Sequence, residues 1–145
     1  MNEVHILLVE DNEGDIILTT EAFKDMKLEN KISVVRDGEE ALRFLKKQGE
    51  HICAVTPQLV LMDINLPGID GKQLLDIIKK DEELKGIPVV MLTCSDRDAD
   101  ISECYDKHVN WYITKPLDYD KYTKVMHELE AFYVSFIPYP KGGSK

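Results

Sequence analysis

Five short apolar runs recur along the chain, and a longer segment follows each of them. The runs cover residues 4–9, 32–35, 59–62, 89–93 and 109–113. A strand of a parallel sheet is covered on both faces, so its sequence is apolar almost throughout instead of alternating with polar residues. The runs therefore predict five buried strands.

The segments between and after these runs have apolar residues at helical spacing. They predict helices over about residues 15–27, from residue 37 to before 48, over 71–81 and 97–107, and from about 118 to 136. Asp37 and Asp70 each precede a glutamate or glutamine by three positions, which marks a helix start. Ser95 or Asp96 is the predicted cap of the fourth helix. Pro138 ends the last helix, because proline cannot continue one.

Strands that alternate with helices predict a parallel sheet joined by right-handed crossovers, with helices on both of its faces. For five strands, the natural doubly wound order is 2-1-3-4-5. The predicted fold class is therefore α/β, with one domain over residues 1–136 and a C-terminal extension over residues 137–145.

Composition narrows the possible partners. The chain has 145 residues, 43% of them hydrophobic, and a net charge of −9. This length suits one domain with a hydrophobic core. The negative charge argues against binding to nucleic acid or to an anionic membrane surface, since both attract basic patches. The three cysteines are scattered and no signal peptide or membrane span is visible, so we expect a cytoplasmic protein with reduced thiols.

Polar residues stand where four of the predicted strands end. Glu10 and Asp11 follow the first strand, Asp63 follows the third, Thr93 ends the fourth, and Lys115 follows the fifth. The carboxyl ends of parallel strands meet at one edge of the sheet, where open α/β sheets bind their ligands. We therefore expect these side chains to form one site.

Three carboxylates at one edge repel one another unless a cation lies between them. Mg²⁺ prefers oxygen ligands, usually one or two carboxylates together with waters and phosphate oxygens. We expect Asp11 and Asp63 to bind this ion directly and Glu10 to act through a water. The backbone carbonyl of Asn65 is a further predicted ligand.

The same residue types suit phosphoryl transfer, which needs positioning and charge neutralisation. Asp63 is the predicted nucleophile, because a carboxylate can form an acyl phosphate. Lys115 and the Thr93 hydroxyl are expected to contact phosphoryl oxygens. Each of these residues alone is more often an ordinary turn, surface or strand residue, so the prediction rests on their combination.

Four segments carry these residues at intervals that are highly specific in combination. They are Val-Glu-Asp-Asn at 9–12, Leu-Met-Asp-Ile-Asn-Leu-Pro-Gly-Ile-Asp-Gly at 61–71, Val-Val-Met-Leu-Thr at 89–93 and Tyr-Ile-Thr-Lys-Pro at 112–116. With them, the chain resembles the receiver domain of two-component response regulators from about residue 4 to about residue 136. The resemblance implies a flavodoxin-like receiver fold.

The resemblance also implies that Asp63 receives its phosphoryl group from a histidine of a separate sensor kinase. It implies a switch in which Thr93 shifts toward the phosphoryl group and Tyr112 turns inward. Such a protein is not an enzyme beyond its own phosphorylation and dephosphorylation. The remaining residues leave no room for an output domain, so we expect the signal to pass by contact to a downstream protein.

A narrower likeness is to the stand-alone regulators that work with phytochrome-type kinases. It rests on residues 9–15, the long loop before Pro57, the segment 114–116 and the aromatic C-terminal end. Relatives of this kind tend to dimerise, and exposed apolar surface usually marks an interface. We therefore expect a homodimer, the alternative being that the tail folds back on its own domain. The predicted dimer residues are Phe132, Tyr133, Phe136, Ile137 and Tyr139.

Two other functions compete with this interpretation. A hydrolase of the haloacid dehalogenase type also forms an aspartyl phosphate. It uses a second aspartate two residues after the nucleophile, where this chain has Asn65, and it carries a cap domain. A receiver without phosphorylation chemistry would lack some of the acids or the lysine, and all of them are present here.

Overall fold

The structure, a computed structural model, describes residues 4–24, 30–115, 120–121 and 124. Strands and helices alternate along this part of the chain. In order they are β1 (Val4–Val9), α1 (Glu13–Lys24), β2 (Asn30–Val35), α2 (Gly38–Lys46), the short 3-10 helix η1 (Gly49–His51), β3 (Leu59–Met62), α3 (Gly71–Lys80), β4 (Val89–Thr93), α4 (Asp98–Asp106) and β5 (Trp111–Thr114). The predicted last helix and C-terminal extension fall almost wholly outside the described residues.

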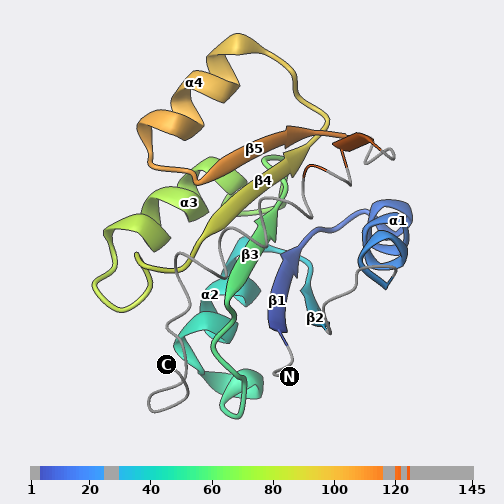
Figure 1. The fold of residues 1–145 in the computed structure, drawn as a ribbon. Coiled ribbons are helices and arrows are strands. Elements are labelled where there is room, and N and C mark those ends of the chain that lie inside the picture. Colours follow the sequence, from blue (N-terminus) through green and yellow to red (C-terminus); the bar gives the residue numbers. More distant parts are fainter. Residues whose placement is uncertain (1–3, 25–29, 116–119, 122–123, 125–145) are drawn as a thin grey trace, which may run out of the picture.

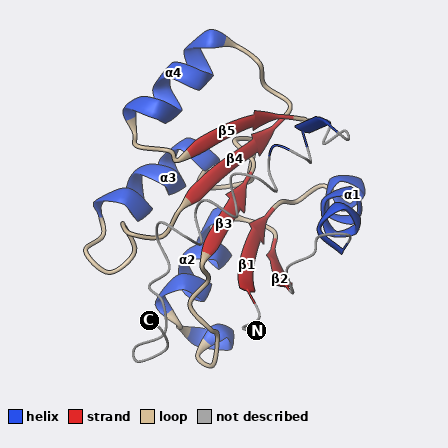
Figure 2. Cartoon of the chain, viewed as in Figure 1, coloured by secondary structure: helices blue, strands red, loops and turns tan. Residues whose placement is uncertain are grey.

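The five strands form one sheet in the order β2-β1-β3-β4-β5, and every neighbouring pair is parallel. Their arrowheads accordingly point toward one edge (Figures 1 and 2). The predicted fold class and strand order are confirmed. In the part of the chain that is described, no helix is both long and apolar enough to cross a bilayer.

Two separate sets of apolar side chains fill the two faces of the sheet, because successive residues of a strand point to opposite sides. On one face, Leu7 and Val9 of β1 belong to a cluster with residues of α2, α3 and α4. On the other face, Ile6 and Leu8 pack with Phe23 of α1. Helices therefore cover both sides of the sheet, with α1 on the side opposite to α2 and α3 (Figure 1).

Helix starts follow the predicted capping residues in two cases out of three. Asp37 accepts the backbone N–H of Glu40, and Asp70 forms a full capping box with Gln73. The prediction for α4 was wrong, because its N-cap is Arg97 and no side chain caps it. The Ser95 hydroxyl instead donates to the carboxylate of Asp100, within α4.

Gly71 sets how closely α3 approaches the end of β3. Its backbone N–H donates to the carbonyl of Ile64 at 2.7 Å. A Cβ atom at this position would lie 2.2 Å from the carbonyl oxygen of Asp63 and 2.6 Å from the Cα of Ile64. Since both obstacles are backbone atoms, no side-chain rotation can relieve the overlap. The absence of a side chain at Gly71 therefore allows α3 to approach the backbone of Asp63 this closely.

We predict that Gly71→Ala lowers the free energy of unfolding by about 1–3 kcal/mol, the usual cost of overpacking. Gly86→Ala is the matched control, because a Cβ there meets nothing within 4 Å. The control should be neutral, or stabilising by about 0.4–1 kcal/mol through the unfolded chain. Urea unfolding of the two variants provides the measurement. Equal stabilities would show that the approach of α3 to β3 is not limited at Gly71.

Candidate functional site

Asp63 follows β3 directly and lies almost buried at the edge of the sheet, with 7% of its surface exposed. Its backbone N–H continues the ladder by donating to the carbonyl of Val9 at 3.2 Å. Its Oδ1 accepts the hydroxyl of Thr93 at 2.7 Å and the backbone N–H of Asn65 at 3.2 Å. The carboxylate is therefore held in one orientation by groups from β4 and from its own loop.

Lys115 follows β5 and brings the only ammonium group that contacts Asp63 among the described residues. Its Nζ lies 2.6 Å from Oε1 of Glu10, 2.8 Å from Oδ2 of Asp15 and 3.0 Å from Oδ2 of Asp63. An ammonium has three N–H donors, so these three carboxylates use all of them. Its backbone N–H donates to the carbonyl of Thr93 at 2.7 Å, which fixes the position of the main chain.

Burial and ion pairing act in opposite directions on this lysine. Burial alone would lower the pKa of Lys115, but hydrogen bonds to Asp15, Glu10 and Asp63 raise it above its ordinary value. Burial raises the pKa of Glu10, and hydrogen bonds from Lys115 and from the backbone N–H of Asn12 offset part of that effect. The ammonium is therefore charged at neutral pH and compensates the acids around it.

Asp15 is a member of this site that the sequence analysis missed. It lies in the first turn of α1, and its backbone N–H donates to Oδ1 of Asn12 at 2.9 Å. Asn12 therefore acts as the cap of the helix and positions this turn beside the end of β1. A sequence signal existed, since Asp15 is the acid at the third position after a capping residue that closely follows a strand end.

Asp11 does not join the other acids. Its side chain is exposed, whereas Glu10 is 3% exposed and Asp63 is 7% exposed. Among the described residues, Glu10, Asp11 and Asp63 do not form a group whose ligand atoms all lie within 4.8 Å of one another. The donor chemistry nevertheless fits a hard divalent cation, because all three offer carboxylate oxygens. Asp11 would have to rotate inward, which an exposed side chain can do without a change of backbone.

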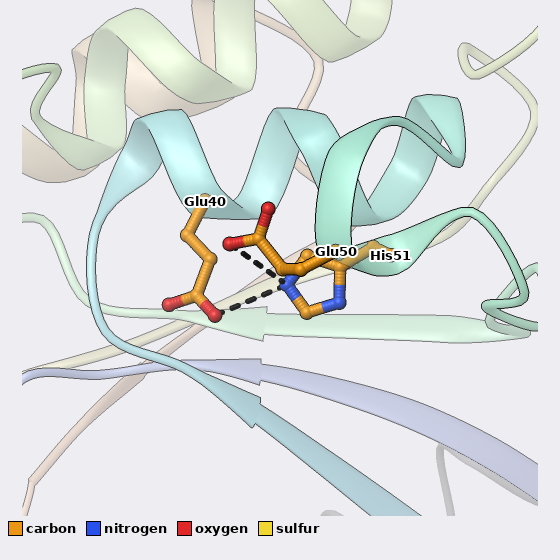
Figure 3. Close-up of side chains that lie close together, drawn as sticks. All are labelled: Glu40, Glu50 and His51. Carbon is orange, nitrogen blue, oxygen red and sulfur yellow. Dashed lines mark hydrogen bonds and ion pairs between the residues drawn. The ribbon is translucent and has the colours of Figure 1, made fainter.

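Glu40, Glu50 and His51 do form a compact group of possible metal ligands (Figure 3). Nε2 of His51 lies 3.1 Å from Glu40 and 4.0 Å from Glu50. Protein groups already engage both acids, since Glu40 accepts the backbone N–H of Arg36 and Glu50 pairs with the guanidinium of Arg43. These contacts tie η1 to α2 and account for the group without a metal.

Tyr112 on β5 is half-buried and packs beside the core on the side of α2 and α3. Its hydroxyl donates to the carbonyl of Ser95 at 2.8 Å. The loop that contains Ser95 is held further by Asp100, which accepts the Ser95 hydroxyl and pairs with Lys72 at 2.6 Å. Tyr112 is thus connected to the loop that directly follows Thr93.

The structure brings Glu10, Asp63, Thr93 and Lys115 together as predicted, with the backbone of Asn65 beside them. The predicted dimer residues lie outside the part of the chain that is described. They are Phe132, Tyr133, Phe136, Ile137 and Tyr139.

Comparison with known proteins adds independent information. The family model of the response regulator receiver domain matches residues 6–127. The chain is 38% identical over 135 residues to the response regulator Rcp1 of Synechocystis sp., which covers 93% of this chain and 92% of Rcp1. It is 37% identical over 131 residues to the probable methanogenesis regulatory protein FilR2 of Methanothrix harundinacea, which covers 90% of this chain and 84% of FilR2.

Solved structures of response regulators are also similar to this chain. The phosphorylated cyanobacterial phytochrome response regulator RcpA superimposes with a TM-score of 0.81 at 41% identity, over 96% of this chain and 99% of RcpA. The Mn²⁺-bound form of Rcp1 gives a TM-score of 0.79 at 38% identity, over 94% of this chain and 99% of that one. The likeness to stand-alone phytochrome-associated regulators is confirmed.

We predict that Lys115→Met lowers the free energy of unfolding at pH 7.5 by about 3–5 kcal/mol, because it leaves buried acids without their cation. The deficit relative to the unsubstituted protein should shrink at pH 5. Burial raises the pKa of Glu10 in the folded state, so its protonation favours folding at low pH, and this contribution is lost as pH rises. Removing Lys115 raises the pKa of Glu10 further, because it removes a hydrogen bond that offsets the effect of burial.

Urea unfolding at the two pH values provides the measurement, and Lys24→Met is the matched control. Lys24 lies on α1, and 67% of its side chain is exposed in an ion pair with Glu21. Such surface pairs contribute about 0–1 kcal/mol. A deficit for Lys115→Met that is as small as the control's, or that is equal at both pH values, would contradict the prediction.

Proposed function

Because the chain belongs to the response regulator receiver family, we propose that it accepts a phosphoryl group on Asp63 from a histidine of a sensor kinase. One observation carries this proposal. The Asp63 carboxylate is buried at the carboxyl end of the central strand, and it contacts the Thr93 hydroxyl at 2.7 Å and the Lys115 ammonium at 3.0 Å. A nucleophile, a hydroxyl donor and a cation at such distances are the parts that phosphoryl transfer needs.

In the proposed reaction, a carboxylate oxygen of Asp63 attacks the phosphorus atom of the phosphohistidine. The new O–P bond forms as the N–P bond breaks, and the histidine nitrogen keeps the electron pair of that bond. Lys115 pairs with one phosphoryl oxygen as a point charge, and the Thr93 hydroxyl donates to another. Both groups need only small movements, since they already contact Asp63.

Mg²⁺ is the proposed cofactor, and its role is to neutralise charge on the acids and the phosphoryl group. Asp11, Asp63 and the carbonyl of Asn65 would hold it, with Glu10 acting through a water. The carboxylate oxygens of this set support the proposal, as does a relative, Rcp1, whose solved structure is a Mn²⁺-bound form. Oxygen-only ligands favour a hard divalent ion such as Mg²⁺ over softer metals that prefer nitrogen or sulfur ligands.

The proposed output is contact with other proteins. Thr93 moves with the phosphoryl group, and the loop that carries Ser95 passes the change to Tyr112 through their hydrogen bond. A phytochrome-type histidine kinase is the proposed donor, because RcpA is a phytochrome response regulator. We propose a cytoplasmic protein that catalyses only its own phosphorylation and dephosphorylation and signals to a downstream protein.

We predict that the protein, incubated with Mg²⁺ and acetyl phosphate, gains one phosphoryl group and that Asp63→Asn abolishes the gain. Mass spectrometry of the intact protein provides the measurement. Asp81→Asn is the matched control, because Asp81 follows α3 and pairs with Lys46, away from the carboxyl ends of the strands. The adduct should be labile to base, as an acyl phosphate is.

The competing functions give different results in the same experiment. Steady release of phosphate from varied small substrates would favour a hydrolase of the haloacid dehalogenase type. Absence of the adduct with every donor would favour a receiver without phosphorylation chemistry. Asn65 argues against the hydrolase, since an amide cannot act as the general acid that this chemistry requires.

We also propose that the protein is a homodimer through its C-terminal residues, because the sequence there is rich in apolar side chains and apolar surface usually marks an interface. A chain ended after Glu130 lacks all five predicted dimer residues and should have a little under half the mass of the full chain by light scattering, as a shortened monomer compared with a dimer. The full chain measured at the same concentration is the reference. An unchanged mass would exclude the tail as the dimer contact.

A further inference from the structure

We propose that Asp15 is a positioning residue for the phosphorylation reaction, which holds the ammonium of Lys115 at the site while Asp63 reacts. This inference rests on the proposed function. It concerns a carboxylate that lies in α1 and not at the end of a strand, and that is not among the proposed metal ligands. Its contact with Lys115 spans 100 positions of the sequence.

The geometry gives Asp15 a distinct place among the partners of Lys115. Its Oδ2 lies 2.8 Å from Nζ, a distance intermediate in length between the 2.6 Å contact of Glu10 and the 3.0 Å contact of Asp63. The side chain of Lys115 is 8% exposed and that of Asp15 is 29% exposed. The pair therefore lies at the boundary between the buried acids and solvent.

The backbone around Asp15 is held firmly. Its own N–H is capped by Asn12, and the N–H of the next residue, Ile16, donates to the carbonyl of Asn12 at 2.9 Å. Ile16 is buried against the face of the sheet that α1 covers. A carboxylate on such a turn is a fixed point for a long and flexible partner like lysine.

The other two partners of Lys115 have further tasks in the proposed reaction. Asp63 becomes an acyl phosphate and presents phosphoryl oxygens in place of its own carboxylate. Glu10 is proposed to act through a water of the cation. Asp15 is then the partner that keeps its contact with Lys115 throughout. Without it, one N–H of the ammonium loses its acceptor, and the side chain regains rotamers that do not reach the phosphoryl group.

Two substitutions separate position from charge. Asp15→Ala removes the acceptor, whereas Asp15→Asn keeps an oxygen at the same place and removes the charge. Glu13→Ala is the matched control, because Glu13 lies in the same turn and makes an ion pair with Arg36 at 2.7 Å. The Glu13→Ala substitution changes the net charge and the interaction with the helix dipole by the same amount as Asp15→Ala.

The test is the initial rate of phosphorylation of the full chain by acetyl phosphate with saturating Mg²⁺. We expect Asp15→Ala to lower the rate about tenfold, and Asp15→Asn to recover most of the loss, because correct placement of a reacting group dominates such effects. Glu13→Ala should stay within about twofold of the unsubstituted protein, as expected for a surface pair. Circular dichroism shows whether each variant is folded.

A second measurement does not depend on activity. The affinity for Mn²⁺, read from the loss of the free-ion signal in electron paramagnetic resonance, should agree within about twofold between Asp15→Ala and Glu13→Ala, because each removes one negative charge from the first turn of α1 and neither removes a proposed ligand. A folded Asp15→Ala variant with this affinity and a tenfold slower reaction would support the inference. Recovery of most of the lost rate by Asp15→Asn completes the support.

Three results would overturn the inference while the proposed function stands. They are an Asp15→Ala variant as fast as the unsubstituted protein, an equal loss in Asp15→Asn and Asp15→Ala, and a tenfold loss of Mn²⁺ affinity beyond that of Glu13→Ala, which would show that Asp15 acts through the cation. If the unsubstituted protein gains no phosphoryl group, the proposed function fails, and the inference fails with it.

Discussion

A single buried ammonium among carboxylates is the interaction on which the rest of this structure depends. Lys115 contacts Glu10 from the end of β1, Asp63 from the end of β3 and Asp15 from α1. Buried acids so close together would repel one another strongly, and each unpaired charge in such a place is costly. Lys115 makes their proximity possible, and it joins the last described strand to the first.

The sequence predicted the sheet and the edge where the site lies, because apolar runs give the strands and parallel strands share the edge at which they end. The sequence was a weaker guide to the direction in which each side chain of the site points. Glu10 and Asp11 are adjacent, so the chain at the end of β1 directs them differently: Glu10 is buried and Asp11 is exposed. Asp15 was not predicted to belong to the site. Its contact with Lys115 depends on how α1 is rotated on the sheet, and the pattern of apolar residues in a short helix does not define that rotation.

The failed prediction for the cap of α4 has an informative cause. A serine before a helix usually satisfies its backbone N–H groups. Here the Ser95 hydroxyl donates to Asp100, and Lys72 pairs with Asp100 from α3. The carbonyl of Ser95 meanwhile accepts the hydroxyl of Tyr112. The loop after Thr93 is thus bound directly by α4 and β5, and through Asp100 it is connected to α3.

The acids at this site outnumber the ammonium, and this imbalance explains why the same residues suit both folding and the proposed chemistry. Glu10, Asp15 and Asp63 already use every N–H of Lys115, so a fourth acid at Asp11 gains nothing from turning inward. A divalent cation would change that balance, because it offers Asp11 a partner and relieves Asp63 of part of its dependence on Lys115. The ammonium would then have an N–H to direct at an incoming phosphoryl oxygen. Excess negative charge is therefore what couples cation binding to the release of one N–H of Lys115 from Asp63, and a site with balanced charges would lack that coupling.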